Sequence, residues 1–271
     1  MRSLNAIEQW PVDHAAATVV GPDGPIGAAG EPDRVFALAS VTKPLVAYAV
    51  LVAVEEGAIE LDAPAGPPGA TVRHLLAHAS GLAFGERRVQ AAPGDKRIYS
   101  SAGFEVLAEL VEAETSIAFP DYLRDAVFAP LGMAASDLVG PAGHGARSST
   151  GDLARFAAEL LRPTLVSEQT ARDAATVQYP GLAGLLPGYG TQRPNDWGLG
   201  FEIKGAKSPH WTGSANSPAT YGHFGQSGTF LWVDPVRRLS CVALADRDFG
   251  DWAKEAWPPL SDAVLVEVDG N

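Results

Sequence analysis

The amino-acid sequence predicts an α+β fold, an α/β sandwich in which both ends of the chain build one antiparallel sheet. Two regions predict the sheet. Residues 19–30 have the pattern of a Gly- and Pro-rich turn between two short strands, and residues 197–246 are aromatic and β-branched segments separated by turns. Between these regions apolar residues recur at helical spacing. This order favours a sheet with helices on its faces and an inserted, mostly helical lobe.

The elements follow from local signals. Residues 40–57 predict a helix that ends at Gly57, and a short helix begins at the capping residue Thr71. The segment Ser101–Thr115 places apolar residues at i, i+3, i+4 and i+7, as an amphipathic helix does. Further helices are expected at 119–129, 150–161, 167–177 and 251–268, and the C-terminal strands at 197–205, 219–225, 228–235 and 238–246.

The whole chain, residues 1–271, is expected to form a single domain of two packed lobes. The α/β lobe is expected at about 1–60 and 190–271, and the helical lobe at about 61–189. No repeat, low-complexity tract or clear linker divides the chain.

Composition excludes several classes of protein. Hydrophobic residues make up 46% of the chain, enough for a sizeable core, and the net charge of −12 argues against nucleic acid and membrane surfaces as partners. Cys241 is the only cysteine and lies in an apolar strand pattern, so we expect a core residue. The N-terminus lacks the apolar core of a signal peptide, so the expected location is cytoplasmic.

Ser40 and Lys43 form the most informative pair. They are three residues apart at the start of the most apolar helix, so their side chains share one face at its N-terminus. Burial beside apolar residues lowers a lysine pKa, and a neutral amine can accept the proton of a serine nucleophile. Ser40 is the only serine in the chain with lysine at i+3.

Other chemistry has weaker support. His74 and His78 are spaced i, i+4, but no carboxylate accompanies them in a metal-binding pattern, so we expect no metal and no other cofactor. The chain has no Gly-x-Ser-x-Gly elbow and no phosphate-binding loop.

Several stretches, taken in order, resemble one family of serine hydrolases. They are "SVTK" (40–43), "LLAHASGL" (75–82), "YSS" (99–101), "APLGM" (129–133), "SSTGDLARFAAELL" (148–161), "WGLGF" (197–201) and "HFG" (223–225). The set is similar to the class C β-lactamase and penicillin-binding-protein-like family, which includes esterases. The resemblance covers roughly residues 15 to 250 and implies a β-lactamase/transpeptidase-like fold.

The resemblance implies a role for each matching residue. Ser40 would be the acyl-accepting nucleophile, Lys43 its base, and Tyr99 a phenol of lowered pKa that shuttles a proton. Ser101, His223 and Gly225 would line the substrate site. The backbone N–H of Gln226 would join that of Ser40 to form the oxyanion hole.

Two departures from the family pattern bear on the substrate. Ser101 replaces the usual asparagine and lacks the amide that would hold a substrate carbonyl and the lysine. His223 replaces a lysine, which removes a permanent cation. Both favour a small ester or amide over a β-lactam as the substrate.

Alternatives stay open at this point. The chain could be a weak or inactive ligand-binding module on the same scaffold, or a true β-lactamase or DD-peptidase. A third possibility is a Ser–His–Asp enzyme that uses His223 with Asp246 or Asp248.

Overall fold

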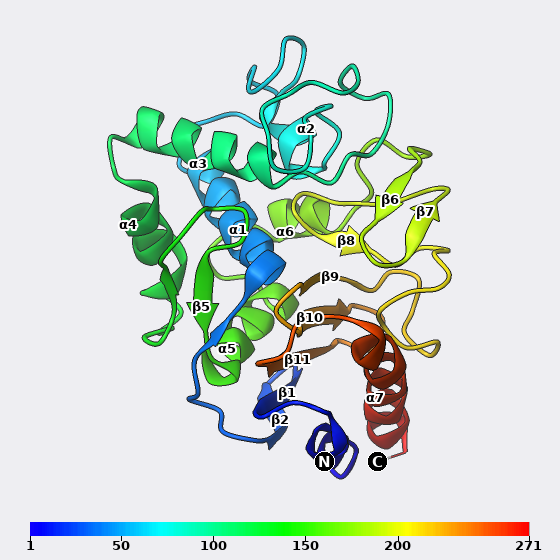
Figure 1. Ribbon diagram of the computed structural model, residues 1–271. Helices are drawn as coiled ribbons and strands as arrows, with labels where there is room; N and C mark the ends of the chain where they lie inside the picture. Colours follow the sequence, from blue (N-terminus) through cyan, green and yellow to red (C-terminus); the bar gives the residue numbers. More distant parts are fainter. Residues whose placement is uncertain (271) are drawn as a thin grey trace.

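The computed structural model describes residues 1–270, and its centre is a six-stranded antiparallel sheet in the order β2–β1–β11–β10–β9–β8 (Figure 1). The strands are β1 (Ala15–Gly21), β2 (Gly24–Ala29), β8 (Glu202–Ile203), β9 (Tyr221–Gly225), β10 (Thr229–Asp234) and β11 (Leu239–Ala245). Strand β1 pairs with β11, so the two ends of the chain meet inside one sheet. The predicted α+β class and the sheet from both chain ends are confirmed.

The sheet separates two hydrophobic cores because its side chains alternate between faces. On β1, Val20 packs into the core beneath α1 (Thr42–Glu55) and α5 (Thr150–Leu161), and its neighbour Val19 packs into the core beneath α7 (Asp251–Asp269). A 3₁₀-helix, Ser3–Gln9, packs beside α7 on this second face. Cys241 lies in the second core, and burial raises its thiol pKa, as expected for a core residue.

Helix α1 is buried nearly all round, as its composition predicts. Twelve of its residues, from Thr42 to Ala53, are buried. Each fully buried Val or Leu contributes about 1.5–3 kcal/mol relative to an exposed one. This burial holds the first turn of α1 and its lysine in one place beside the sheet.

The remaining helices match the expected positions closely. They are α2 (Val72–Leu76), α3 (Ser101–Thr115), α4 (Phe119–Leu123) and α6 (Glu168–Ala174). The segment 119–129 differs from expectation, because α4 passes into a π-helical turn, Arg124–Phe128. Helix α5 lies in the range expected for the helical lobe but packs against β1 and β11 of the sheet.

Two smaller sheets complete the fold. Strands β3 (Phe36–Ala37), β5 (Ala146–Ser148) and β4 (Asp137–Leu138) form one, and the hairpin of β6 (Gly184–Leu186) and β7 (Gly190–Gln192) forms the other. The chain termini lie close together near the lower edge of the sheet in Figure 1. None of the helices within residues 1–270 combines the length and the apolar character that a membrane span requires.

Candidate active site

Ser40 lies in a single 3₁₀ turn, Ala39–Val41, that leads directly into α1. The turn is held against the β9–β10 hairpin, since Thr229 Oγ1 donates to Leu38 O at 2.9 Å and Ser227 Oγ donates to Ala37 O at 2.6 Å. Ala39 has φ +44, a left-handed conformation that L-residues rarely adopt. The chain therefore presents Ser40 in front of the positive N-terminal end of a helix.

Lys43 is fully buried in the first turn of α1, and its side-chain nitrogen contacts three oxygen atoms. Nζ lies 3.4 Å from Ser40 Oγ, 3.1 Å from Ser101 Oγ and 2.7 Å from Gly143 O. Burial lowers the pKa of Lys43 to about 7, and the charge of Glu105 opposes part of this effect. Near neutral pH a large fraction of Lys43 is therefore a neutral amine, as the sequence predicts.

Ser101 lacks the amide of the asparagine that it replaces, but its hydroxyl contacts the lysine at 3.1 Å. Its hydroxyl lies at the start of α3, and the carbonyl of Gly143 supplies a further acceptor for the lysine. A Cβ on Gly143 would lie 2.8 Å from Ser101 Cβ, so only glycine allows this close approach. Ser101 therefore contacts Lys43 through its hydroxyl without the amide, and the Gly143 loop fills the space that a longer side chain would need.

Glu105 secures that loop, and the sequence analysis missed it. Its carboxylate accepts the backbone N–H of Ala142 at 3.1 Å and that of Gly143 at 2.8 Å. Glu105 lies four residues after Ser101 on α3 and therefore on the same face of the helix. That spacing was the available signal, but the loop it binds is distant in the sequence.

Tyr99 lies between the lysine and His223. Lys43 Nζ is 4.5 Å from the centre of the Tyr99 ring, and the phenol oxygen lies 3.4 Å from His223 Nε2. Burial raises the pKa of Tyr99 above its usual range, and a hydrogen bond with Ser40 offsets only part of this. The expected lowering of the Tyr99 pKa is wrong, because desolvation of the phenolate outweighs the favourable contacts.

His223 is a neutral hydrogen-bond partner on β9. Its Nδ1–H donates to Phe224 O at 2.6 Å, so Nε2 faces Tyr99 as an acceptor. Burial and the charge of Lys43 lower the pKa of His223 to about 3. His223 therefore supplies no cation at neutral pH.

The Ser–His–Asp alternative fails on this geometry. Asp246 pairs with His14 Nδ1 at 2.7 Å, and the His223 nitrogen that a carboxylate would orient is occupied by Phe224 O. Within residues 1–270, neither Asp246 nor Asp248 has a hydrogen bond to His223.

Gly225 ends β9 beside Ser40, and Gln226 begins the turn that follows. A Cβ on Gly225 would lie 2.3 Å from Leu38 O and 3.2 Å from Ser40 N, so the glycine allows the serine segment to pack against the strand. The Gln226 side chain is turned to Phe249 O, at 3.3 Å. The Gln226 side chain thus points away from Ser40, and the role of its backbone N–H in an oxyanion hole stays a prediction.

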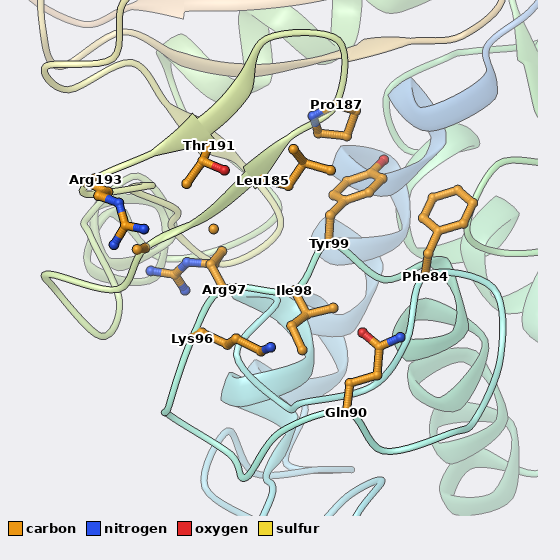
Figure 2. A pocket seen from close by; sticks show the side chains of 12 residues that line it. Phe84, Gln90, Lys96, Arg97, Ile98, Tyr99, Leu185, Pro187, Thr191 and Arg193 are labelled. Carbon is orange, nitrogen blue, oxygen red and sulfur yellow. The ribbon is translucent and has the colours of Figure 1, made fainter.

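A cavity of about 150 Å³ opens at Ser40. Its lining includes Tyr99, His223 and Gln226, with apolar walls from Phe84, Leu186, Pro187, Trp197 and Phe224 and the side chain of Glu202. Phe84, Tyr99 and Pro187 also line a larger adjoining cleft of about 700 Å³ (Figure 2). The cavity at Ser40 thus shares three lining residues with a more open cleft.

His74 and His78, the two histidines spaced i, i+4, both have hydrogen-bond partners within the protein. His74 Nδ1 contacts Thr71 Oγ1 at 2.9 Å, and His78 Nδ1 accepts the N–H of Ser100 at 3.1 Å. His78 also supports Tyr99, with ring centres 4.7 Å apart. In the part of the chain that the structure describes, no group of His, Cys, Asp and Glu side chains has the arrangement of a metal site.

The sheet, the inserted helices and this cluster define a β-lactamase/transpeptidase-like fold, the scaffold of penicillin-binding-protein-like serine hydrolases. The chain belongs to the Beta-lactamase family, whose model matches residues 14–264. A crystal structure described as a β-lactamase from Mycobacterium bovis is 60% identical, with 98% of each chain covered and a TM-score of 0.97.

More distant relatives carry varied names. A structure of EstCE1, described as a hydrolase with promiscuous acyltransferase activity, shares the fold at 18% identity and a TM-score of 0.77, with 97% of this chain and 96% of that chain covered. A putative D-alanyl-D-alanine carboxypeptidase of Escherichia coli K12 is 25% identical over 208 residues, 57% of this chain and 46% of its own length. The chain thus spans about half the length of the curated relatives it matches.

Proposed function

We propose that this protein hydrolyses small esters or amides through an acyl-enzyme formed on Ser40. The observation that carries the proposal is the position of Lys43, a buried amine with a pKa of about 7 whose nitrogen lies 3.4 Å from Ser40 Oγ. A lysine in this state can accept a proton at neutral pH, which a solvated lysine cannot.

The contacts of Lys43 also support a direction for proton transfer. A neutral amine has two N–H groups and one lone pair. Gly143 O can only accept a hydrogen bond, and Ser101 Oγ lies at 3.1 Å as a second acceptor. The lone pair is then left for Ser40, whose hydroxyl donates to it.

The reaction follows in two halves. Lys43 takes the Ser40 proton while Oγ attacks the carbonyl carbon, and the backbone N–H groups of Ser40 and Gln226 stabilise the oxyanion. Tyr99, kept protonated by burial, donates its proton to the departing oxygen or nitrogen and is reprotonated from Lys43. Water then attacks the acyl-enzyme, releases the acid and returns Ser40 to its starting state.

The neutral state of His223 supports a substrate class, namely esters or amides that carry no carboxylate beside the scissile bond. A permanent cation at this position would pair with such a carboxylate, as in a β-lactam, but the pKa of about 3 leaves His223 uncharged. We therefore expect short-chain aryl esters to react faster than nitrocefin.

The test is turnover of 4-nitrophenyl acetate and nitrocefin by the wild-type protein and by Ser40→Ala. We expect ester turnover to fall at least about 1,000-fold in Ser40→Ala. Wild-type protein without ester or lactam turnover would leave a ligand-binding module as the better account. Faster turnover of nitrocefin than of the ester would overturn the substrate order and favour a β-lactamase.

A further inference from the structure

The larger cleft beside the Ser40 cavity has a charged end that the proposed reaction does not use. It adjoins the cavity at Tyr99, Phe84 and Pro187, and its far end carries Lys96 and Arg193 (Figure 2). The walls between the two ends include Ile98 and Leu185 and are mostly apolar. A bound molecule could therefore extend from Ser40 past Tyr99 to the two cations.

Backbone pairing places the two cations on the two sides of β6, although they are far apart in the sequence. Arg97 forms a bridge with Gly184 of β6, and Gly184 pairs with Gln192 of β7. Lys96 precedes Arg97 and Arg193 follows Gln192, so the two side chains start from segments on opposite sides of β6, two strand spacings or ~10 Å apart. Lys96 is also three residues before Tyr99, which limits their Cα separation to about 11 Å.

The cations at this end form no ion pair within the described residues. Lys96, Arg97 and Arg193 line the cleft, and its lining includes no Asp or Glu. None of the three forms an ion pair with a carboxylate in residues 1–270. They thus form a positive patch in a chain whose net charge is −12.

Arg97 contributes to this patch from below the surface. Its buried guanidinium donates to three backbone carbonyls, Asn195 O at 3.0 Å, Ala77 O at 2.5 Å and Gln178 O at 2.8 Å, with a longer contact to Tyr179 O. Burial lowers its pKa to about 10, so it stays protonated at neutral pH. Its hydrogen-bond partners are neutral carbonyls, and the nearby charge of Asp196 offsets part of the positive field that Arg97 adds to the cleft.

We propose that this cleft binds the leaving-group half of the substrate and that this half ends in a carboxylate paired with Lys96 and Arg193. The inference rests on the proposed function, because Tyr99, the proton donor to the leaving group, forms the wall shared by the cavity and the cleft. An apolar spacer fits the walls between Tyr99 and the cations. The anion is thus remote from the scissile bond.

The experiment compares two aryl acetates of similar reactivity, 3-(4-acetoxyphenyl)propanoate and its methyl ester. Their acyl groups are identical, and they differ in the charge at the far end of the leaving group. We expect kcat/KM to be about 3- to 10-fold higher for the carboxylate, as for one or two partly exposed ion pairs. The preference should shrink as salt is raised, because screening weakens the pairing.

Variants connect the preference to the two cations. In Lys96→Ala/Arg193→Ala the ratio of kcat/KM values should fall to about 1, and in Lys96→Glu/Arg193→Glu it should invert. The control Arg155→Ala/Lys254→Ala removes the same charge from exposed positions outside the cleft lining and should keep the preference.

The outcomes separate this inference from the proposed function. Ser40-dependent hydrolysis of both acetates at equal kcat/KM would overturn the anionic subsite and leave the hydrolase intact. A preference that survives in Lys96→Glu/Arg193→Glu would also overturn it. If neither acetate is hydrolysed, the proposed function itself fails.

Discussion

Lys43 Nζ lies 2.7 Å from the carbonyl oxygen of Gly143, one hundred residues later in the chain. The N–H of Gly143 in turn donates to Glu105, so a carboxylate on α3 fixes the loop that orients the lysine. The same carboxylate acts on the lysine through its charge, since it raises a pKa that burial lowers. Glu105 is therefore a positioning residue with an electrostatic effect that can be measured.

Glu105→Gln should change the pH profile as well as the rate. Loss of the negative charge lowers the pKa of Lys43 further, so the acid limb of kcat/KM should move to lower pH. A glutamine keeps one acceptor for the loop, and we expect kcat to fall by about 2- to 10-fold. Glu109→Gln, on the exposed part of the same helix, is the matched control. An unchanged acid limb in Glu105→Gln would contradict the electrostatic role.

The wild-type profile itself should report the titration of Lys43. The base must be neutral, so kcat/KM for a neutral ester should fall as the pH drops through about 7. His223 titrates near pH 3 and adds nothing in this range, and the raised pKa of Tyr99 keeps the phenol protonated on the alkaline side. A rate that stays constant from about pH 5 to about pH 9 would exclude Lys43 as the base.

Lys43→Met should stabilise the fold while abolishing turnover. The pKa of Lys43 is lowered from 10.5 to about 7 on folding, so the unfolded state binds more protons between these values and stability rises with pH across that window. Below about pH 7 the folded state contains a buried, charged lysine, and the full cost of desolvating that charge lowers the free energy of unfolding. Methionine removes this cost but leaves Gly143 O without its hydrogen-bond donor. We therefore expect the free energy of unfolding to rise by about 1–3 kcal/mol. Urea unfolding at about pH 6 and pH 9 should show the larger gain at the lower pH. A loss of stability at the lower pH would refute this.

Ser101→Asn should not create a β-lactamase. The glycine loop approaches Ser101 so closely that a larger side chain must displace Gly143, the lysine's carbonyl partner. We expect a loss of about 1–3 kcal/mol in stability and a lower ester turnover, measured by thermal unfolding and by kcat. Ser101→Ala, which removes only one contact with Lys43, should cost about 0.5–1.5 kcal/mol. Gain of nitrocefin turnover in Ser101→Asn would show that the loop can move aside.

The sequence predicted the elements well where local signals are strong. The amphipathic spacing of Ser101–Thr115 and the apolar helix behind Lys43 appear in the structure at the expected positions. Helix α2 also appears with its predicted cap, since the side chain of Thr71 accepts the backbone N–H of His74. These features depend on neighbours within a few residues, which a single sequence displays directly.

The site was predicted less completely because its electrostatics depend on distant residues. The low pKa of Lys43 follows from its own helix, but the Gly143 carbonyl and Glu105 enter only through the fold. The raised pKa of Tyr99 needs the burial that the surrounding elements create together. The positive end of the cleft likewise needs the bridge between Arg97 and Gly184, which no local pattern indicates.

Intact-mass spectrometry of the protein quenched in acid during turnover of 4-nitrophenyl acetate tests the central claim most directly. The account predicts a covalent acetyl adduct that maps to the peptide containing Ser40 and is absent in Ser40→Ala. Lys43→Met should form the adduct much more slowly in the same experiment. Ester turnover with no adduct on wild-type protein under a range of quench times, or an adduct that persists in Ser40→Ala, would contradict the account.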